Sequence, residues 1–246
     1  MSIVQRRTAI VTGSSRGIGR AAAERLAKDG LSVIINYAGN DAAAHEAVDA
    51  ITAAGGTAKA FKADIADPAA VTAMFDAAEQ FFGGIDVAVN NAGILKLASI
   101  ADYTDEAFDQ SIAINLKGTF NIAREASKRL RAGGRIINLS TSVIGMRLPT
   151  YGVYIATKAA VEGLTQVLAQ EMRSRNITVN AVAPGPTATD LFLEGKSPEL
   201  IDRMSKMNPL ERLGTPEDIA RVVSFLAGPD GAWVNGQTLR ANGGMC

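Results

Sequence analysis

Tyr154 and Lys158 are two residues whose types and spacing suit acid–base chemistry. They lie four positions apart near the start of a segment with helical periodicity, so their side chains share one face of the expected helix. A phenol, with an ordinary pKa of about 10, exchanges protons poorly at neutral pH, and a neighbouring ammonium stabilises the phenolate and shifts its pKa toward the working range. The pair is a candidate for general acid–base catalysis. Many helices carry such a pair by chance, so its context has to support the assignment.

A hydroxyl cluster, Ser140-Thr141-Ser142, provides part of that context. It follows an expected strand at residues 135–139, and ligands of open α/β sheets bind at this carboxyl edge. A hydroxyl there would orient a substrate oxygen for proton transfer. Asn115 is a second candidate because it falls within a long expected helix, where an amide has only modest propensity. An exposed helical asparagine is the alternative interpretation.

A glycine-rich turn, T-G-S-S-R-G-I-G, occupies residues 12–19 between the first expected strand and the first expected helix. A glycine turn at this place lets the backbone approach a pyrophosphate closely, and the helix N-terminus supplies N–H donors. The spacing differs from the G-x-G-x-x-G fingerprint. A simple tight turn is the alternative, but the position at the first strand favours a nucleotide site.

The end of the second expected strand bears on which nicotinamide cofactor would bind. An acidic residue there would bind the ribose 2′-hydroxyl of NAD. The sequence instead continues through residues 36–40 without a carboxylate until Asp41, and Arg16 in the glycine turn could pair with a 2′-phosphate. NADP(H) is therefore expected. The alternative is that Arg16 is a solvated loop residue.

Short apolar runs alternate with Ala-rich helical segments along the whole chain. Because the runs are apolar on both faces, they predict a parallel sheet covered by helices, which is an α/β fold. The expected strands are 9–11, 33–36, 58–61, 87–90, 135–139, 178–182 and 238–240, and the expected helices are 17–29, 42–54, 68–82, 105–131, 153–175 and 216–227. Thr215 and Pro216, with Asp218 at the third helical position, predict the cap of the last helix. One domain over residues 1–246 is expected.

Residues 184–215 form the longest irregular stretch, with one short helix expected near 198–207. Such a segment inside a compact domain is usually functional, and we expect it to be a substrate loop. Five apolar residues are candidates for a lid over an apolar substrate, with core or interface packing as the alternative: Leu191, Phe192, Leu193, Met204 and Met207.

The motifs occur in an order that resembles the short-chain dehydrogenase/reductase family over essentially the whole chain. They are the glycine turn, N-N-A-G at 90–93, Asn115, the hydroxyl cluster, Y-I-A-T-K at 154–158 and P-G-P-T-A-T at 184–189. Residues 36–40 are further similar to NADPH-dependent ketoreductases such as trihydroxynaphthalene reductase and 3-oxoacyl-carrier-protein reductase. The resemblance implies a single-domain Rossmann fold, a doubly wound parallel sheet of about seven strands with helices on both faces, and interconversion of a carbonyl and an alcohol on a small molecule.

The resemblance also implies a catalytic tetrad. Tyr154 would be the acid in reduction and the base in oxidation, Lys158 would lower its pKa and hold the nicotinamide ribose, and Asn115 would anchor a water. Counting back from Tyr154 makes Thr141 the catalytic hydroxyl, whereas counting back from Gly145 makes it Ser142; we prefer Ser142. The cofactor-binding residues implied are Gly13, Ser15, Arg16, Gly17, Ile18, Gly19, Asn36, Tyr37, Ala38, Asp64, Ile65, Asn91, Ala92, Gly93, Tyr154, Lys158, Pro184, Gly185, Thr187 and Thr189.

Composition argues against other classes of function. Lys and Arg total 25, as do Asp and Glu, so the chain lacks the basic excess of a nucleic-acid or membrane-surface binder. One histidine, His45, and one cysteine, Cys246, predict neither a metal site nor an internal disulfide. Arg6-Arg7 precedes an apolar stretch, residues 8–12, that is too short for an export signal, so a cytoplasmic protein is expected.

Three other functions remain as alternatives. One is a non-catalytic NADP-sensing protein, which would keep the glycine turn but would not need Tyr154 and Lys158. The second is an NAD-dependent alcohol dehydrogenase of the same fold. The third is an epimerase or dehydratase, which usually has a longer C-terminal substrate domain. The resemblance further implies a homotetramer.

Overall fold

Residues 6–246 are described by a computed structural model, and within them seven strands form one parallel sheet. The order across the sheet is β3-β2-β1-β4-β5-β6-β7, so the direction of winding reverses between β1 and β4. The strands are β1 (Thr8–Val11), β2 (Ser32–Tyr37), β3 (Thr57–Lys62), β4 (Ile85–Asn90), β5 (Leu130–Leu139), β6 (Thr178–Pro184) and β7 (Thr238–Ala241). The doubly wound α/β sheet expected from the sequence is confirmed, although the first five residues of the expected domain lie outside the described part.

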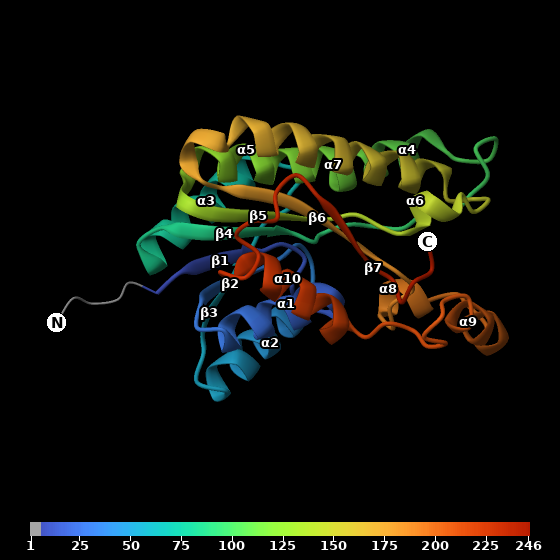
Figure 1. Cartoon of the computed structure of the whole chain (residues 1–246), viewed down its shortest axis with the longest axis horizontal. Helices are drawn as coiled ribbons and strands as arrows, with labels where there is room; N and C mark the ends of the chain where they lie inside the picture. Colours follow the sequence, from blue (N-terminus) through green and yellow to red (C-terminus); the bar gives the residue numbers. More distant parts are fainter. Residues whose placement is uncertain (1–5) are drawn as a thin grey trace.

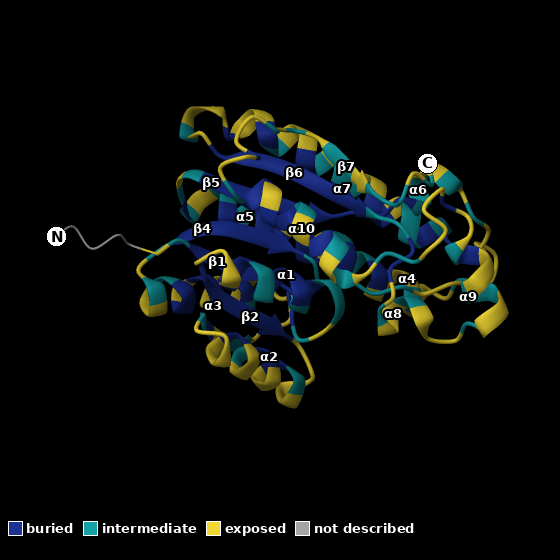
Figure 2. Ribbon diagram, turned by 60° about the horizontal axis from the view of Figure 1, so that its bottom comes forward, coloured by how far each residue is buried: buried dark blue, intermediate teal, exposed yellow. Residues whose placement is uncertain are grey.

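Helices cover both faces of this sheet (Figure 1). α1 (Gly17–Lys28), α2 (Asp41–Ala53) and α10 (Pro216–Ala227) lie on one face, and α3 (Pro68–Phe82), α5 (Thr119–Arg129) and α7 (Gly152–Glu171) lie on the other. The central strands are dark blue in Figure 2 because both of their faces are buried, while the outer sides of the helices are exposed. Burial on both faces explains why central strands such as β1 and β4 are largely apolar, whereas the edge strands β3 and β7 include exposed residues.

Alternate residues of the central strands belong to two separate apolar cores. On β1, Ala9 and Val11 pack with α1, α2 and α10, whereas Ile10 packs on the opposite side with α3 and α5. On β2, Ile34 belongs with Ile10 in the second core. This alternation follows from the two-residue period of a strand. The alternation fixes the register in which neighbouring strands pair, and this register determines where each strand ends relative to the next.

The last expected helix begins as the sequence predicts. Thr215 accepts a hydrogen bond from the Asp218 backbone N–H, the Asp218 carboxylate accepts one from the Thr215 N–H, and Pro216 is the first helical residue. Three short helices lie near the carboxyl edge of the sheet: α6 (Val143–Met146), α8 (Asp190–Leu193) and α9 (Pro198–Ser205). α9 coincides with the short helix expected near 198–207.

The continuous helix expected over residues 105–131 is wrong in two respects. The structure has α4 (Asp105–Ser111), then a π-helical segment (Ile112–Gly118), then α5, which ends at Arg129. β5 already begins at Leu130, where it pairs with Ile85 before the register shifts to Val87 and Arg135. Gly133, with a φ of +81°, lies within that irregular stretch. Because Leu130 pairs with β4, residues 130 and 131 belong to β5, although helical periodicity predicts that they continue the helix.

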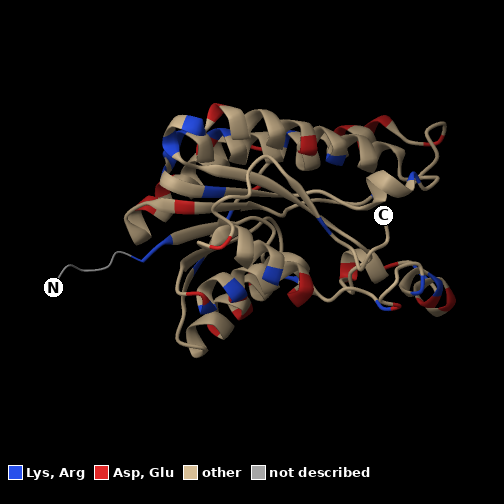
Figure 3. Cartoon of the chain, viewed as in Figure 1, with Lys and Arg blue, Asp and Glu red and all other residues tan. Residues whose placement is uncertain are grey.

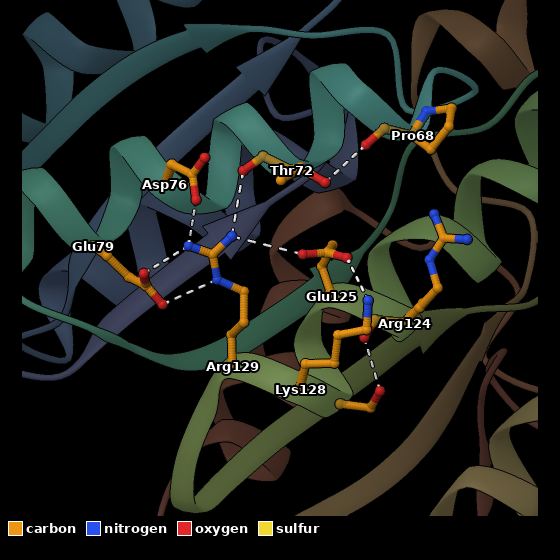
Figure 4. A network of polar contacts seen from close by, with 9 residues as sticks. Pro68, Thr72, Asp76, Glu79, Arg124, Glu125, Lys128 and Arg129 are labelled. Carbon is orange, nitrogen blue, oxygen red and sulfur yellow. Dashed lines mark hydrogen bonds and ion pairs between the residues drawn. The ribbon is translucent and has the colours of Figure 1, made fainter.

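An ionic network joins α3 to α5 (Figure 4). The Arg129 guanidinium lies 2.6 Å from the carboxylates of Asp76 and Glu79 and 3.6 Å from that of Glu125. Its side chain is only 17% exposed, and the hydrogen bonds that it donates to Glu79 raise the pKa of Arg129 above its ordinary value. The network anchors the C-terminal end of α5, which continues directly from the π-helical segment.

Charged residues of both signs are interspersed along the outer helices (Figure 3). No helix in the described range 6–246 combines the length and the apolar character that crossing a bilayer requires.

Candidate active site

Two adjoining cavities open at the carboxyl edge of the sheet, near the short helices α6 and α8. The larger has a volume of about 420 Å³ and lies beside the glycine turn; the smaller, of about 140 Å³, lies beside Tyr154. Both are lined by Ile18, Asn91, Gly93, Thr189 and Leu191. The two cavities are therefore neighbouring parts of one site, at the edge where ligands of such sheets bind.

The glycine turn is held against the ends of β2 and β4. The Asn91 side chain donates hydrogen bonds to the carbonyls of Thr12 (2.9 Å) and Gly13 (3.0 Å), and the Gly13 N–H donates to the Asn36 side chain at 3.2 Å. Gly13 has a φ of +60°, and a Cβ there would lie 2.8 Å from the Cα of Ala92. Only glycine permits both this conformation and this approach. The structure thus brings the turn, Asn36 and residues 91–93 together, as the sequence predicts.

The end of β2 presents no carboxylate to the larger cavity. Residues 36–40 line it, but Asp41, the first acid after the strand, does not. The Asp41 carboxylate accepts a hydrogen bond from Tyr37 at 2.8 Å and pairs with Lys62 at 3.2 Å, and the hydrogen bond from Tyr37 is the main reason why the pKa of Asp41 lies below its ordinary value. Asp64 and Ile65 line the opposite side. The cavity therefore suits the adenosine half of a dinucleotide.

Arg16 lies at the edge of this cavity with 69% of its side chain exposed. Its guanidinium lies 3.8 Å from the carboxylate of Asp190, which follows Thr189 at the start of α8. A mostly solvated guanidinium beside a strand end without a carboxylate fits a dinucleotide that carries an additional phosphate.

The smaller cavity is apolar around its polar end. Tyr154, Lys158 and Thr141 line it together with Pro184, Gly185 and Thr187, and its apolar walls include Leu95, Val143, Met146, Leu191, Phe192 and Met204. Three of the five residues that are candidates for a lid, Leu191, Phe192 and Met204, thus line this cavity. Leu193 and Met207 do not line either cavity, and they are 36% and 45% exposed.

Lys158 is buried beneath Tyr154. Its Nζ donates a hydrogen bond to the carbonyl of Leu139 at 2.7 Å and lies 5.9 Å from the centre of the Tyr154 ring. Burial lowers the pKa of Lys158 to about 8. The sequence predicts a lowered pKa for Tyr154, but this expectation is wrong for the structure: burial raises the pKa of Tyr154 to about 12, and the nearby Thr141 hydroxyl offsets only part of that rise. The phenol is therefore a protonated donor at neutral pH.

Asn115 lies in the π-helical segment and faces the loop after β4. Its Oδ1 accepts a hydrogen bond from the Ile94 N–H at 2.8 Å, and its Nδ2 donates to the Ile94 carbonyl at 2.9 Å. A Cβ on Gly93 would lie 3.2 Å from the Asn115 Oδ1 and 3.6 Å from the Lys158 Nζ. Asn115 therefore holds the loop between the two cavities, in which Gly93 leaves no room for a larger side chain beside Asn115 and Lys158. Its role as a water anchor stays a prediction.

The structure favours Thr141 over Ser142 as the hydroxyl that faces Tyr154. The Ser142 hydroxyl donates to the Ala183 carbonyl at 2.8 Å and accepts from the Asn242 side chain at 3.1 Å, and Ser142 does not line the smaller cavity. Ser140 is also engaged, since its hydroxyl donates to the Glu162 carboxylate at 2.7 Å. Thr141 lines the cavity together with Tyr154, and its hydroxyl acts to lower the pKa of the Tyr154 phenol. This geometry supports Thr141, the alternative from the sequence, over the preferred Ser142, and the catalytic role of either hydroxyl stays a prediction.

The strand pairing explains this arrangement. The Ser140 N–H donates to the Val182 carbonyl and the Ser142 N–H donates to the Pro184 carbonyl, so the β5–β6 ladder continues past Leu139. Neighbouring residues of an extended segment face opposite sides, which places Thr141 out of phase with Ser142. Ser140 also lines the smaller cavity, but its hydroxyl is bonded to Glu162.

Two residues of the site were not singled out from the sequence. Tyr151 lines the smaller cavity, and its spacing of three residues from Tyr154 on one helix was a usable signal. Asn242 supports Ser142 from a distant part of the chain, and no sequence pattern indicates it. His45 lies on α2, where its Nδ1 is 2.8 Å from the Asp41 carbonyl. Between residues 6 and 246, no cluster of three or more His, Cys, Asp or Glu side chains could hold a metal ion.

Comparisons with known proteins match nearly the whole chain. A family model described as "Enoyl-(Acyl carrier protein) reductase" matches residues 13–246. The chain is 48% identical to "Short-chain type dehydrogenase/reductase" of Picea abies, over 97% of this chain and 92% of the relative. It is 44% identical to "NADPH-dependent aldehyde reductase 2, chloroplastic" of Arabidopsis thaliana, over 97% and 93%. A short-chain dehydrogenase from Burkholderia cenocepacia, solved in complex with NADP, superposes with a TM-score of 0.93 at 38% identity and covers 98% of both chains.

Proposed function

The chain belongs to the short-chain dehydrogenase/reductase family of oxidoreductases, and we propose that it uses NADP(H) to interconvert a carbonyl group and a secondary alcohol on a small, largely apolar molecule. The observation that carries this proposal is the position of the Tyr154 phenol. It lies in an apolar cavity with Thr141 and Lys158, and that cavity adjoins a second one beside the glycine turn. Substrate and dinucleotide would thus meet at the residues that both cavities share.

The glycine turn and Arg16 would hold the cofactor in the larger cavity. Backbone N–H groups at the start of α1 suit the pyrophosphate, and Arg16 suits a ribose 2′-phosphate because no β2 carboxylate lies beside it. Thr187 and Thr189, which line the smaller cavity, suit the nicotinamide half. When bound, the nicotinamide supplies the hydride for reduction and takes it back in oxidation. An NADP complex of the Burkholderia cenocepacia relative and the name of the Arabidopsis relative support the same cofactor.

Three side chains of the smaller cavity would position the substrate oxygen and transfer the proton to it. Thr141 hydrogen-bonds the substrate oxygen and holds it near the phenol, and Tyr154 donates its proton to that oxygen as the carbonyl is reduced. The ammonium of Lys158 then stabilises the phenolate from the buried side. Asn115 keeps the loop that carries Gly93 against Lys158. The apolar walls exclude water and so strengthen these interactions.

The test is a carbonyl panel assayed with NADPH and with NADH, for the wild type and for Tyr154→Phe. We expect the wild type to consume NADPH in preference to NADH. Tyr154→Phe should lose turnover by at least about a hundredfold, as removal of a general acid does, while NADPH affinity changes by no more than a few-fold. A wild type that binds NADPH but reduces no carbonyl would favour the sensor alternative, and retained turnover in the variant would refute the role of Tyr154.

We also propose the homotetramer that the resemblance implies. Phe120 on α5 and Val167 on α7 are 45% and 59% exposed, and such an assembly would cover them. Light scattering checks the proposal, because the chain mass is 25.7 kDa and a tetramer has four times that mass. A monomeric mass would exclude it.

A further inference from the structure

Tyr151 forms a wall of the smaller cavity beside Tyr154. The two tyrosines lie three residues apart at the start of α7, their ring centres are 6.5 Å apart, and the rings meet edge-on at 67°. Tyr151 lines the cavity and is only 9% exposed. A second phenol therefore stands next to the one to which we assign the proton transfer.

The Tyr151 hydroxyl has no partner in the described part of the chain. It takes part in no hydrogen bond within residues 6–246, unlike the hydroxyls of Tyr37 and Tyr103, which bond to Asp41 and Ser111. It is also not among the side-chain polar atoms that are sealed from solvent without a partner. Since Tyr151 lines the smaller cavity, its hydroxyl is a donor available to a bound molecule. Burial raises the pKa of Tyr151, so the phenol keeps its proton at neutral pH.

The backbone around Tyr151 is held in an unusual conformation. Thr150, directly before it, has a φ of +72°, which is rare for a β-branched residue. The Thr150 carbonyl accepts a hydrogen bond from the Ala98 N–H at 3.3 Å, and Ile100 packs against Gly152 on the other side of Tyr151. A strained residue persists only where its surroundings fix it, and such residues cluster at functional sites. The loop at 98–100 therefore contacts the residues on both sides of Tyr151.

We propose that Tyr151 is a specificity-determining residue that donates a hydrogen bond to a second oxygen of the substrate. The proposal rests on the proposed function, in which Tyr154 and Thr141 bind the reacting carbonyl. The apolar walls, such as Leu95, Val143 and Met146, accept only hydrocarbon. The preferred substrates are then cyclic carbonyl compounds with an apolar framework and one further hydroxyl or carbonyl oxygen on the same ring system. A ketone without that oxygen leaves the buried Tyr151 hydroxyl without a partner, which is costly.

The experiment compares cyclohexanone with 3- and 4-hydroxycyclohexanone, with NADPH as cofactor. In these two isomers the hydroxyl is not on the carbon next to the carbonyl, so the carbonyl differs little in reactivity from that of cyclohexanone. For the wild type, we expect kcat/KM to be about tenfold higher for at least one hydroxyketone than for cyclohexanone. In Tyr151→Phe, which keeps the ring and removes only the hydroxyl, this ratio should fall to near one.

Tyr103→Phe is the matched control. It removes a phenol hydroxyl that bonds Ser111, away from both cavities, so the wild-type ratio should persist. The proposal is overturned if the wild type reduces both ketones without preference, or if Tyr151→Phe retains the preference. A wild type that reduces no carbonyl in the broader panel contradicts the proposed function instead, so the two failures are distinguishable.

Discussion

The guanidinium of Arg16 lies 3.8 Å from the carboxylate of Asp190, so the glycine turn and the first turn of α8 are linked by charge across the larger cavity. Both side chains are largely exposed, which makes the ion pair weak. In the proposed complex, the ribose 2′-phosphate takes Asp190's place beside Arg16. The negative charge of Asp190 then competes with the phosphate and also repels it.

Asp190→Asn should therefore bind NADPH about two- to fivefold more tightly than the wild type, in line with the modest energy of an exposed ion pair. Fluorescence titration with NADPH and NADH checks this, because NADH lacks the phosphate and its affinity should not change. Arg16→Ala is the converse control and should weaken NADPH far more than NADH. An equal change for both cofactors in either variant would remove the assignment of the phosphate to Arg16.

Thr141→Val should lower kcat about a hundredfold or more, as loss of one preorganised donor to a developing charge does. Valine matches threonine in shape, so NADPH affinity and the melting temperature should stay close to those of the wild type. Ser142→Ala should behave oppositely. It leaves the Asn242 amide and the Ala183 carbonyl without their partner and should lower the free energy of unfolding by about 1–2 kcal/mol while kcat stays within a few-fold. The reverse pattern would restore Ser142 as the catalytic hydroxyl.

The rate of carbonyl reduction should fall as the pH rises through about 8. Burial lowers the pKa of Lys158 to about 8, so the ammonium is present below that pH and lost above it. The phenol keeps its proton throughout, because the pKa of Tyr154 is about 12. Above pH 8 the proton donor remains, but the charge that stabilises its phenolate is gone. A pH profile of kcat from 6 to 10 measures this fall.

Lys158→Arg provides the control for that profile. A guanidinium stays charged over the whole range, so whatever activity remains should show no fall near pH 8. A fall that persists in Lys158→Arg would assign the titration to another group.

Arg129→Met should lower the free energy of unfolding by about 2–4 kcal/mol, because it leaves the carboxylates of Asp76, Glu79 and Glu125 without their shared, largely buried cation. Chemical denaturation measures the change. Lys206→Met is the matched control, since its ion pair with Asp202 is largely exposed and should contribute under about 1 kcal/mol. Equal effects would mean that the network in Figure 4 does not support α5.

Most of the fold could be predicted from local patterns. Six of the seven strands begin and end within two residues of the expected bounds. They could be predicted because buried strands are rich in apolar and β-branched residues and alternate with helical segments. β5 is the exception. Its first residues pair with β4 although their sequence continues a helical pattern, and only the tertiary pairing of Leu130 with Ile85 decides between the two.

The sequence predicts which segments form the candidate site, but not the directions in which their side chains point. Ordered motifs located the glycine turn, residues 90–93 and the Tyr154–Lys158 pair. The choice between Thr141 and Ser142 depends on how far the β5–β6 ladder runs, and the contact between Asn242 and Ser142 joins residues that are 100 positions apart. Neither the length of the ladder nor this contact can be recognised from the spacing of residues along the sequence. The rise in the Tyr154 pKa likewise reflects burial by residues from several elements.

The π-helical segment at Ile112–Gly118 makes the position of Asn115 depend on the number of residues in that segment. A π-turn accommodates a residue more than the α-helix around it needs. Deleting one residue there would let the two flanking helices join as a regular α-helix with little disturbance to the rest of the domain, yet it would swing Asn115 off the Ile94 backbone. The position of the Asn115 amide relative to Lys158 thus depends on one additional residue in the helix, and no substitution at position 115 can reproduce the effect of deleting it.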